Sequence, residues 1–468
     1  MGLPRPAACT PGAGDPRRCP HRPGLCLRRC AGRFRKAGGV YLPLQWRTQH
    51  YEEGRGMNKG LLSGARALDL TDETGFVCGK VLTELGIDVI KVERPGGDAS
   101  RMIPPFHQDI PGVERSLYWK AFNTGKRGIT LGIENPRGTE VFRDLVSRVD
   151  FVMESFEPGY LERIGLGYEA LRAINPKLVV ISITPFGQVG PYSHYKGSEL
   201  IAIAMSGVLN NTGDPDRPPV KESLDSGLFH AGIAGALGGV MAYYHALMSG
   251  EGQQVDVSVQ EVAASRLTSS ILAWDMERVS LTRDGHKSQM GPTSTDWFWE
   301  CKDGHLFWHM LGGAFGAPAN KALSDWMDEY LEENPLREVT DWMKFDKAGI
   351  PQEQWDRFAD AIRPFFLRFT KDEIREQSLK RGTNATVAND PHDLLESEQL
   401  RSRGYWTRLE DPVLGSLEFP KYFFQSRDTE NFSLTAAPQV GADNEVVFRD
   451  ELGLSTEKID ELRSANAI

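Results

Sequence analysis

Short apolar segments typical of β-strands alternate with helical segments through the first half of this chain. The predicted strands lie at 66–70, 87–93, 151–154 and 178–184, and the predicted helices between them at 75–85, 135–146 and 168–174. A strand–helix–strand unit implies a parallel pair joined by a right-handed crossover. Sustained alternation of this kind predicts an α/β fold with a Rossmann-like, open parallel sheet.

The segment 227–247 (GLFHAGIAGALGGVMAYYHAL) contains no Asp, Glu, Lys or Arg and is long enough to cross a membrane. Its five glycines, together with His230 and His245, favour a buried helix of a large α/β protein instead. Its small residues would let another backbone approach closely. We therefore expect no membrane association.

A chain of 468 residues is long enough for two or three domains. We expect residues 57–261 to form the first part of a large Rossmann-like domain. Residues 262–365 contain seven tryptophans and are less regular, which predicts a smaller central domain with linkers. Residues 366–468 are expected to return to the large domain and to end in a helix that starts at Ser455.

Residues 1–56 differ in composition from the rest. They carry eleven basic and three acidic side chains and four of the six cysteines. Pro and Gly interrupt any periodicity, so we expect a disordered, dispensable extension, with the working protein starting near Met57. Cys19, His21, Cys26 and Cys30 match no standard zinc spacing, so no metal site is expected.

The charge of the chain limits its partners. The overall formal charge is −10, and the extension contributes +8, so the remainder carries −18. An excess of acid argues against a nucleic-acid binder. Outside the extension only Cys78 and Cys301 remain, which is typical of a reduced, cytoplasmic protein.

Several loops that follow predicted strands contain polar groups where open α/β sheets bind ligands. The loop 93–101 places Arg94 and Arg101 around two glycines, a pair that a phosphate could use, although loop arginines are often only solvated. The missing G-x-G-x-x-G motif leaves a nicotinamide dehydrogenase unsupported. The loop 154–159 has the composition of a Pro-Gly turn, and Ser198 could cap a helix over 199–209.

Asp225 precedes the glycine-rich segment, and two roles are open for it. Aspartate at a helix start is commonly an N-cap. The same carboxylate could instead attack an electrophilic carbonyl. Composition and spacing do not separate these two roles.

Taken in order, several motifs resemble the family III CoA-transferases, also called the CaiB/BaiF or formyl-CoA transferase family. These motifs are LTDETG, DVIKVERPGGDxxR, LYWKAFNTGKRGITL, ESFEPGYLERIGLGYEALRAINPKLVVISITPFGQVGP, the 225–227 turn, GEGQQVDVSVQE, LRSRGYWTRLEDPVLG and APQVGADNEVVFRDELGLS. The resemblance runs from Leu68 to the C-terminus. It implies an interlocked homodimer of two ring-like subunits, each with a large CoA-binding domain built from both chain ends.

The resemblance also implies a reaction and a site. Coenzyme A would pass from an acyl-CoA to a carboxylic acid through an anhydride and then a CoA thioester on Asp225, the nucleophile. No tightly bound cofactor is expected, since CoA is a substrate. The implied CoA-binding residues are Glu73, Thr74, Arg94, Leu131, Gly132, Ile133, Glu134, Ser155, Phe156, Glu157, Arg163, Lys196, Gly197, Ser198 and Glu199.

An unperturbed aspartate is ionised at neutral pH, so attack on the thioester needs no general base. Backbone N–H groups at Gly227 would stabilise the oxyanions that form. Two departures from the formyl-CoA transferases stand out. No clear GGGG loop is present, which makes oxalate and formate doubtful substrates, and Thr74 stands where those enzymes carry a glutamine.

Two rival functions remain open. The first is an α-methylacyl-CoA racemase, whose family places a histidine where this chain has Ser198, a residue that cannot act as a suitable base. The second is a non-catalytic CoA-binding subunit that pairs with an active homologue, which the presence of Asp225 disfavours.

Overall fold

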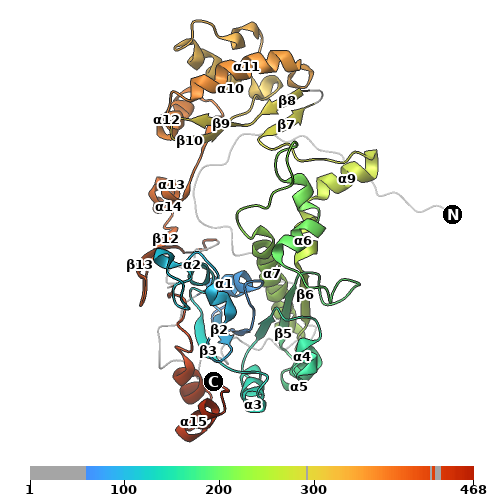
Figure 1. Cartoon of the computed structure of the whole chain (residues 1–468), viewed down its shortest axis with the longest axis vertical. Helices are drawn as coiled ribbons and strands as arrows, with labels where there is room; N and C mark the ends of the chain where they lie inside the picture. Colours follow the sequence, from blue (N-terminus) through green and yellow to red (C-terminus); the bar gives the residue numbers. More distant parts are fainter. Residues whose placement is uncertain (1–59, 291–292, 422–423, 427–433) are drawn as a thin grey trace, which may run out of the picture. The chain divides into compact units, whose positions relative to one another are not determined.

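The computed structural model describes residues 60–290, 293–421, 424–426 and 434–468. The predictions for residues 1–56 lie outside this part of the chain. The predicted α/β fold is confirmed by a parallel sheet of six strands in the order β3-β2-β1-β4-β5-β6 (Figure 1). Its strands are β1 (Arg66–Asp69), β2 (Asp88–Glu93), β3 (Arg127–Thr130), β4 (Phe151–Glu154), β5 (Val179–Thr184) and β6 (Gln254–Ser258).

Alternate residues of β1, β2, β4 and β5 face two different cores, as the two-residue period of a strand requires. Leu68 of β1 belongs to the core that contains α3 (Pro136–Val146) and α5 (Tyr168–Ile174). Ala67 belongs to the core that contains α1 (Phe76–Glu84), α7 (Ser226–Ser249) and α8 (Val259–Ser265). Both faces of the sheet are thus covered, which explains why every residue of the inner strand β5 (VVISIT) is buried.

The C-terminal segment packs against the first of these cores. A π-helix, η8 (Glu445–Glu451), contributes Val447 and Phe448, and α15 (Thr456–Ser464) contributes Ile459 and Leu462. The predicted start of the last helix is confirmed, since Ser455 accepts a hydrogen bond from the backbone N–H of Lys458.

Gly232, Gly235 and Gly239 of α7 face α1 and β5. A Cβ on Gly232 would lie 2.6 Å from Cβ of Val77 and 2.9 Å from the backbone nitrogen of Cys78. The predicted close approach of another backbone is therefore confirmed. Without these glycines the helix would not fit against α1 at this distance.

Only one face of α7 is buried, so the expectation of a buried helix holds for that face alone. By length and composition α7 could cross a membrane, yet its buried face packs on β5 and β6 (Figure 1). On the opposite face Leu237, Met241 and Tyr244 are 62%, 65% and 66% exposed. The result is an apolar helix face that no described residue covers.

The tryptophan-rich region has a core of its own. Its strands are β7 (Lys287–Met290), β8 (Thr293–Asp296), β9 (Phe298–Cys301), β10 (Gly304–Phe307) and β11 (Thr386–Ala388). Its helices are α10 (Gly313–Asp328), α11 (Gln352–Phe366) and α12 (Lys371–Arg381). Trp299, Trp308, Trp326 and Trp355 are buried in this core, which extends past residue 365 to Ala385. The predicted domain boundaries stay predictions.

The remaining elements are short. The helices are α2 (Leu117–Phe122), α4 (Tyr160–Arg163), α6 (Glu199–Met205), α9 (Thr268–Glu277), α13 (Pro391–Glu396) and α14 (Glu398–Ser402). Strands β12 (Trp406–Asp411) and β13 (Gly415–Pro420) form a hairpin. The 3₁₀ turns are η3 (Ala99–Met102), η4 (His107–Asp109), η5 (Val208–Asn211), η6 (Pro335–Glu338) and η7 (Lys347–Gly349).

Candidate active site

The strand order reverses between β1 and β4, and in open α/β sheets this is where ligands bind. The loops that leave these two strands are tied together there. The hydroxyl of Ser155 donates to Oδ1 of Asp72 at 2.8 Å, and the backbone N–H of Asp72 donates to Oγ of Ser155 at 2.8 Å. Ser155, a predicted CoA-binding residue, therefore helps fix the turn that contains Glu73 and Thr74.

Four of the predicted CoA-binding residues gather around Tyr160. The ring of Phe156 stacks on Tyr160 with centroids 4.6 Å apart, and the guanidinium of Arg163 lies 5.6 Å from the Tyr160 centroid. The Tyr160 hydroxyl donates to Glu134. Burial and Glu134 raise the pKa of Tyr160 to about 12, against the charges of Arg94 and Arg163. Two exposed arginines beside an aromatic platform suit a phosphate-bearing nucleotide.

Arg101 takes no part in this group. It is fully buried, its Nε lies 2.6 Å from Oε2 of Glu93, and its guanidinium covers the ring of Trp119 at 4.0 Å. The idea that Arg94 and Arg101 bind phosphate together is therefore wrong, because Glu93 already neutralises Arg101. Arg94 remains exposed.

The segment 131–134 is mainly structural. Leu131 and Ile133 are buried in the core of the sheet, and the backbone N–H of Gly132 donates to the carbonyl of Ala467 at 2.8 Å. Among these four residues only Glu134 is exposed. A ligand would meet its carboxylate and the backbone here, and not the two apolar side chains.

The loop before α6 is largely exposed. Lys196 and Ser198 are exposed, and a Cβ on Gly197 would lie 2.6 Å from Cβ of Pro185. Ser198 occupies the N-cap position but makes no side-chain cap, and α6 ends at Met205 instead of continuing to 209. The helix stops early because Gly207 adopts a left-handed conformation with φ of 88°.

Asp225 occupies the N-cap position of α7 without acting as its cap. Its side chain accepts no hydrogen bond from the helix, and it is 35% exposed. The carboxylate that caps the helix belongs to Glu199, whose Oε1 accepts from the backbone N–H of Gly227 at 3.1 Å. The sequence left open two roles for Asp225, a helix N-cap and a nucleophile. In this geometry the side chain of Asp225 does not act as the cap.

Glu199 therefore uses the Gly227 amide that we expected to stabilise oxyanions. The neighbouring N–H of Ser226 donates to the carbonyl of Leu224 at 2.8 Å. Neither amide is available in this arrangement. An oxyanion beside Asp225 needs another donor.

Tyr118 and Lys221 stand beside Asp225, and our sequence reasoning missed both. Burial raises the pKa of Tyr118 above its usual value, and so do the charges of Asp225, Glu73 and Glu199. Lys221 Nζ lies 2.5 Å from Oδ1 of Asp225 and 3.3 Å from Oε2 of Glu199. The spacing of Lys221 to Asp225, four residues, was a signal that could have been used.

A buried network of charged side chains lies beside the turn that follows β1. Asp69 and Lys126 pair at 2.7 Å, and Lys91 Nζ lies 3.6 Å from the same carboxyl and donates to the carbonyl of Thr71. Burial opposes ionisation of Asp69, but the two lysines outweigh it and hold its pKa at about 2. Burial lowers the pKa of Lys126 to about 8. The network fixes the backbone that carries Glu73 and Thr74.

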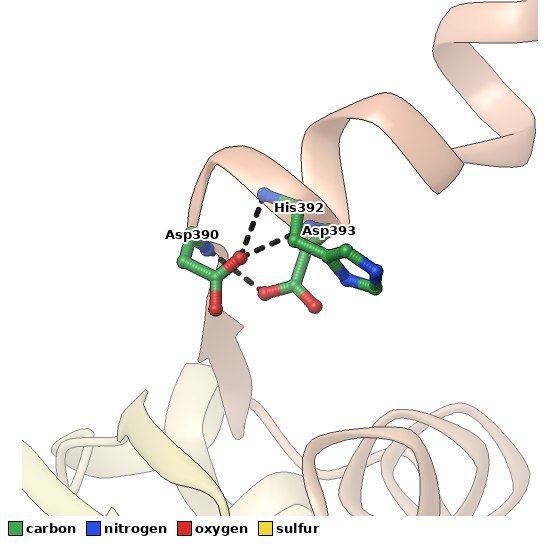
Figure 2. A group of neighbouring side chains, drawn as sticks. All are labelled: Asp390, His392 and Asp393. Atoms are coloured by element: carbon green, nitrogen blue, oxygen red, sulfur yellow. Dashed lines mark hydrogen bonds between the residues drawn. The ribbon is translucent and has the colours of Figure 1, made fainter. Parts of the chain in front are cut away.

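Outside these groups, Asp390, His392 and Asp393 lie together at the start of α13 (Figure 2). Their arrangement is explained by a capping box, in which Asp390 accepts from the N–H groups of His392 and Asp393. Lys371 Nζ pairs with both carboxylates and supplies their counter-charge. The three residues therefore have a structural role that needs no bound ion.

Comparison with known proteins agrees with this fold and identifies the family. The model of CoA-transferase family III matches residues 62–444. The BbsE subunit of succinyl-CoA:(R)-benzylsuccinate CoA-transferase from Thauera aromatica is 32% identical over 86% of this chain and 97% of that one. Formyl-CoA:oxalate CoA-transferase from Streptomyces coelicolor is 28% identical over 88% of this chain and 100% of that one.

A solved structure of a CaiB/BaiF family protein from Brucella suis matches with a TM-score of 0.70 at 25% identity, over 84% of this chain and 100% of that one. The fold thus defines an α/β protein with a strand order of the Rossmann type. The chain belongs to CoA-transferase family III. It is a CoA-transferase that acts on CoA thioesters, which confirms the resemblance stated from its motifs.

Proposed function

We propose that this enzyme transfers CoA from an acyl-CoA to a carboxylic acid through covalent intermediates on Asp225. The observation that carries this proposal is that Glu199, and not Asp225, caps α7. A carboxylate placed at a helix start without a capping duty remains available for attack on a carbonyl.

The Asp225 carboxylate attacks the acyl-CoA carbonyl, the C–S bond breaks, and a mixed anhydride forms with release of the CoA thiolate. The thiolate then attacks the aspartyl carbonyl, and the original acid leaves. The incoming acid reverses both steps. Tyr118 is the donor that we assign to the oxyanions, since its hydroxyl stands beside Asp225 and a tyrosine is protonated at neutral pH.

The nucleotide end of CoA is assigned to the group around Tyr160. Arg94 and Arg163 would meet the phosphates, while Phe156 and Tyr160 provide an aromatic surface. The turn of Glu73 and Thr74 lies between this group and Asp225, because Ser155 holds it from one side and the charge of Glu73 acts on Tyr118 at the other. This order fits a thioester arm that runs from the phosphates to the nucleophile.

We infer an interlocked homodimer, as the family resemblance implies. The apolar face of α7 supports it, and so does α9, in which no residue is buried and Trp274 and Met276 are 54% and 77% exposed. Apolar surface of this extent on a soluble protein marks an interaction site. A second copy would cover it.

An assay with several readouts tests the function. The full chain is incubated with succinyl-CoA and a panel of acids, including a C4–C5 dicarboxylate and oxalate, because relatives are named for such substrates. Formation of a new acyl-CoA by the chain alone supports the proposal. Exchange of the α-proton of a 2-methylacyl-CoA without transfer would establish a racemase. CoA binding without either reaction would favour a non-catalytic subunit, a point raised because one relative is named as a subunit.

A further inference from the structure

The surroundings of Asp225 pose an electrostatic problem for the second substrate. Three carboxylates, those of Glu73, Glu199 and Asp225, lie close enough to Tyr118 for their charges to act on its hydroxyl. The acceptor is itself a carboxylate and must bring an anionic oxygen to the Asp225 carbonyl. Like charges repel strongly where water is partly excluded. A cation is needed beside the nucleophile.

Lys221 is placed to supply that cation. Its ammonium contacts Asp225 Oδ1 at 2.5 Å and Glu199 Oε2 at 3.3 Å. The hydrogen bond to Asp225 raises the pKa of Lys221 above its usual value, so the side chain remains protonated. The side chain is 33% exposed, which leaves room for a ligand to reach it. The nearby Arg266 is already engaged, since it pairs with Glu222 at 2.7 Å.

The charge of Asp225 changes during the reaction that we propose. Once Asp225 is esterified as a thioester, it is neutral and no longer balances the ammonium. Lys221 then retains Glu199 as a partner. The N–H that it donated to Asp225 becomes available to the incoming acid. The same residue can thus hold the nucleophile in the resting enzyme and an anion in the intermediate.

We propose that Lys221 binds the carboxylate of the acceptor acid when Asp225 carries CoA. This inference rests on the proposed function. The acceptor oxygen forms a C–O bond to the aspartyl carbonyl, the C–S bond breaks, and CoA leaves as thiolate. The thiolate then forms a C–S bond to the acyl carbon, and the C–O electron pair returns to Asp225. Lys221 keeps its proton throughout.

The test compares a charged with a neutral acceptor on the same intermediate. Wild-type enzyme and Lys221→Met are loaded with CoA from succinyl-CoA, freed of excess reagent, and discharged with either a carboxylic acid or hydroxylamine. We expect discharge by sub-saturating acid to slow by about tenfold or more in Lys221→Met, as expected for a lost charged hydrogen bond. Discharge by neutral hydroxylamine should stay within about twofold, since no anion has to be bound.

Lys221→Arg should restore discharge by the acid, because it keeps a cation at this position. Lys321→Met is the matched control, as Lys321 pairs with Asp325 four residues on in the same way but lies in α10. Equal slowing with acid and hydroxylamine, or an unchanged rate with acid, would overturn the role of Lys221. Failure of the proposed function itself looks different, since the wild-type enzyme would then acquire no CoA at all.

Discussion

Asp69 neutralises the ammonium groups of Lys91 and Lys126 beside the turn that follows β1, and all three side chains are buried. Asp69→Asn would leave Lys91 and Lys126 without that charge. We expect the free energy of unfolding to fall by about 3–5 kcal/mol, as when one partner of a buried ion pair is removed. Urea unfolding followed by circular dichroism measures it. Asp325→Asn is the control, since Asp325 and its partner Lys321 are 56% and 63% exposed and exposed pairs contribute about 1 kcal/mol or less. Equal losses would contradict the account.

Glu154, at the end of β4, predicts a pH dependence. Burial raises its pKa from 4.5 to about 7. Between these values the unfolded chain has released a proton that the folded chain keeps, so stability falls as pH rises. The whole effect is at most about 3 kcal/mol.

In Glu154→Gln this dependence should be lost. The variant should match the wild type near pH 4.5 and be more stable at pH 8, by about 1–3 kcal/mol. Urea titrations at the two pH values check this. Glu157→Gln removes an exposed carboxylate three residues away and controls for the loss of charge. If Glu154→Gln were no more stable than the wild type at pH 8, burial would not be destabilising the ionised form of Glu154.

The sequence placed Asp225 at a helix start but did not reveal what surrounds it. Glu199 and Tyr118 come from other parts of the chain, and their distances to Asp225 depend on how α2, α6 and α7 pack. Lys221 is the exception, because it lies only four residues before Asp225. The sequence did not predict that Glu199 caps α7, because this hydrogen bond joins residues 28 positions apart. Local patterns report short-range geometry, so such tertiary contacts escape them.

At the scale of elements, four strands of the parallel sheet were predicted, because period and β-branched composition are local signals. The edge strands β3 and β6 were not predicted, since they are short and contain several polar residues. The helix at 199 was predicted too long, since a left-handed Gly207 ends it and apolar spacing alone does not report this. The glycine-rich helix was predicted as buried because its composition is apolar on all sides. The structure shows that one face of it is exposed within one chain, including Leu237, Met241 and Tyr244.

The fit of α7 against α1 gives a graded prediction. Gly232→Ala would press a methyl group against Val77 and the backbone of Cys78, which cannot move easily. We expect a loss of about 1–3 kcal/mol in the free energy of unfolding, typical of overpacking. At Gly235 the nearest atom is Cδ1 of Ile183 at 3.0 Å, a side-chain end. Gly235→Ala should therefore change stability by less than about 1 kcal/mol. Chemical denaturation of both variants decides it, and the reverse order would contradict this packing.

For the whole molecule, the exposed face of α7 predicts the oligomeric state. Native mass spectrometry should give twice the mass of one chain. Leu237→Asp, which places a charge on a residue that is 62% exposed in one chain, should yield monomer or insoluble protein. Leu379→Asp is the control, as Leu379 is 81% exposed on α12 and should leave the dimer intact. A wild-type monomer, or a Leu237→Asp dimer of unchanged stability, would contradict the interlocked assembly.

The family, and through it the reaction class, was predictable because motifs from both ends of the chain agree in their order. That the extension at 1–56 is dispensable stays a hypothesis. The family model matches from residue 62. The domain boundaries depend on packing that spans the chain. The aromatic core draws in Phe369, Ile374 and Ala385, which local composition did not associate with the tryptophans.

The attachment of CoA to Asp225 is the central claim, and intact-protein mass spectrometry tests it most directly. The full chain mixed with succinyl-CoA should gain the mass of one CoA less water, and proteolysis should place this on the peptide that contains Asp225. Asp225→Asn should gain nothing and show no transfer. A CoA adduct on another residue, or transfer that survives in Asp225→Asn, would contradict the account.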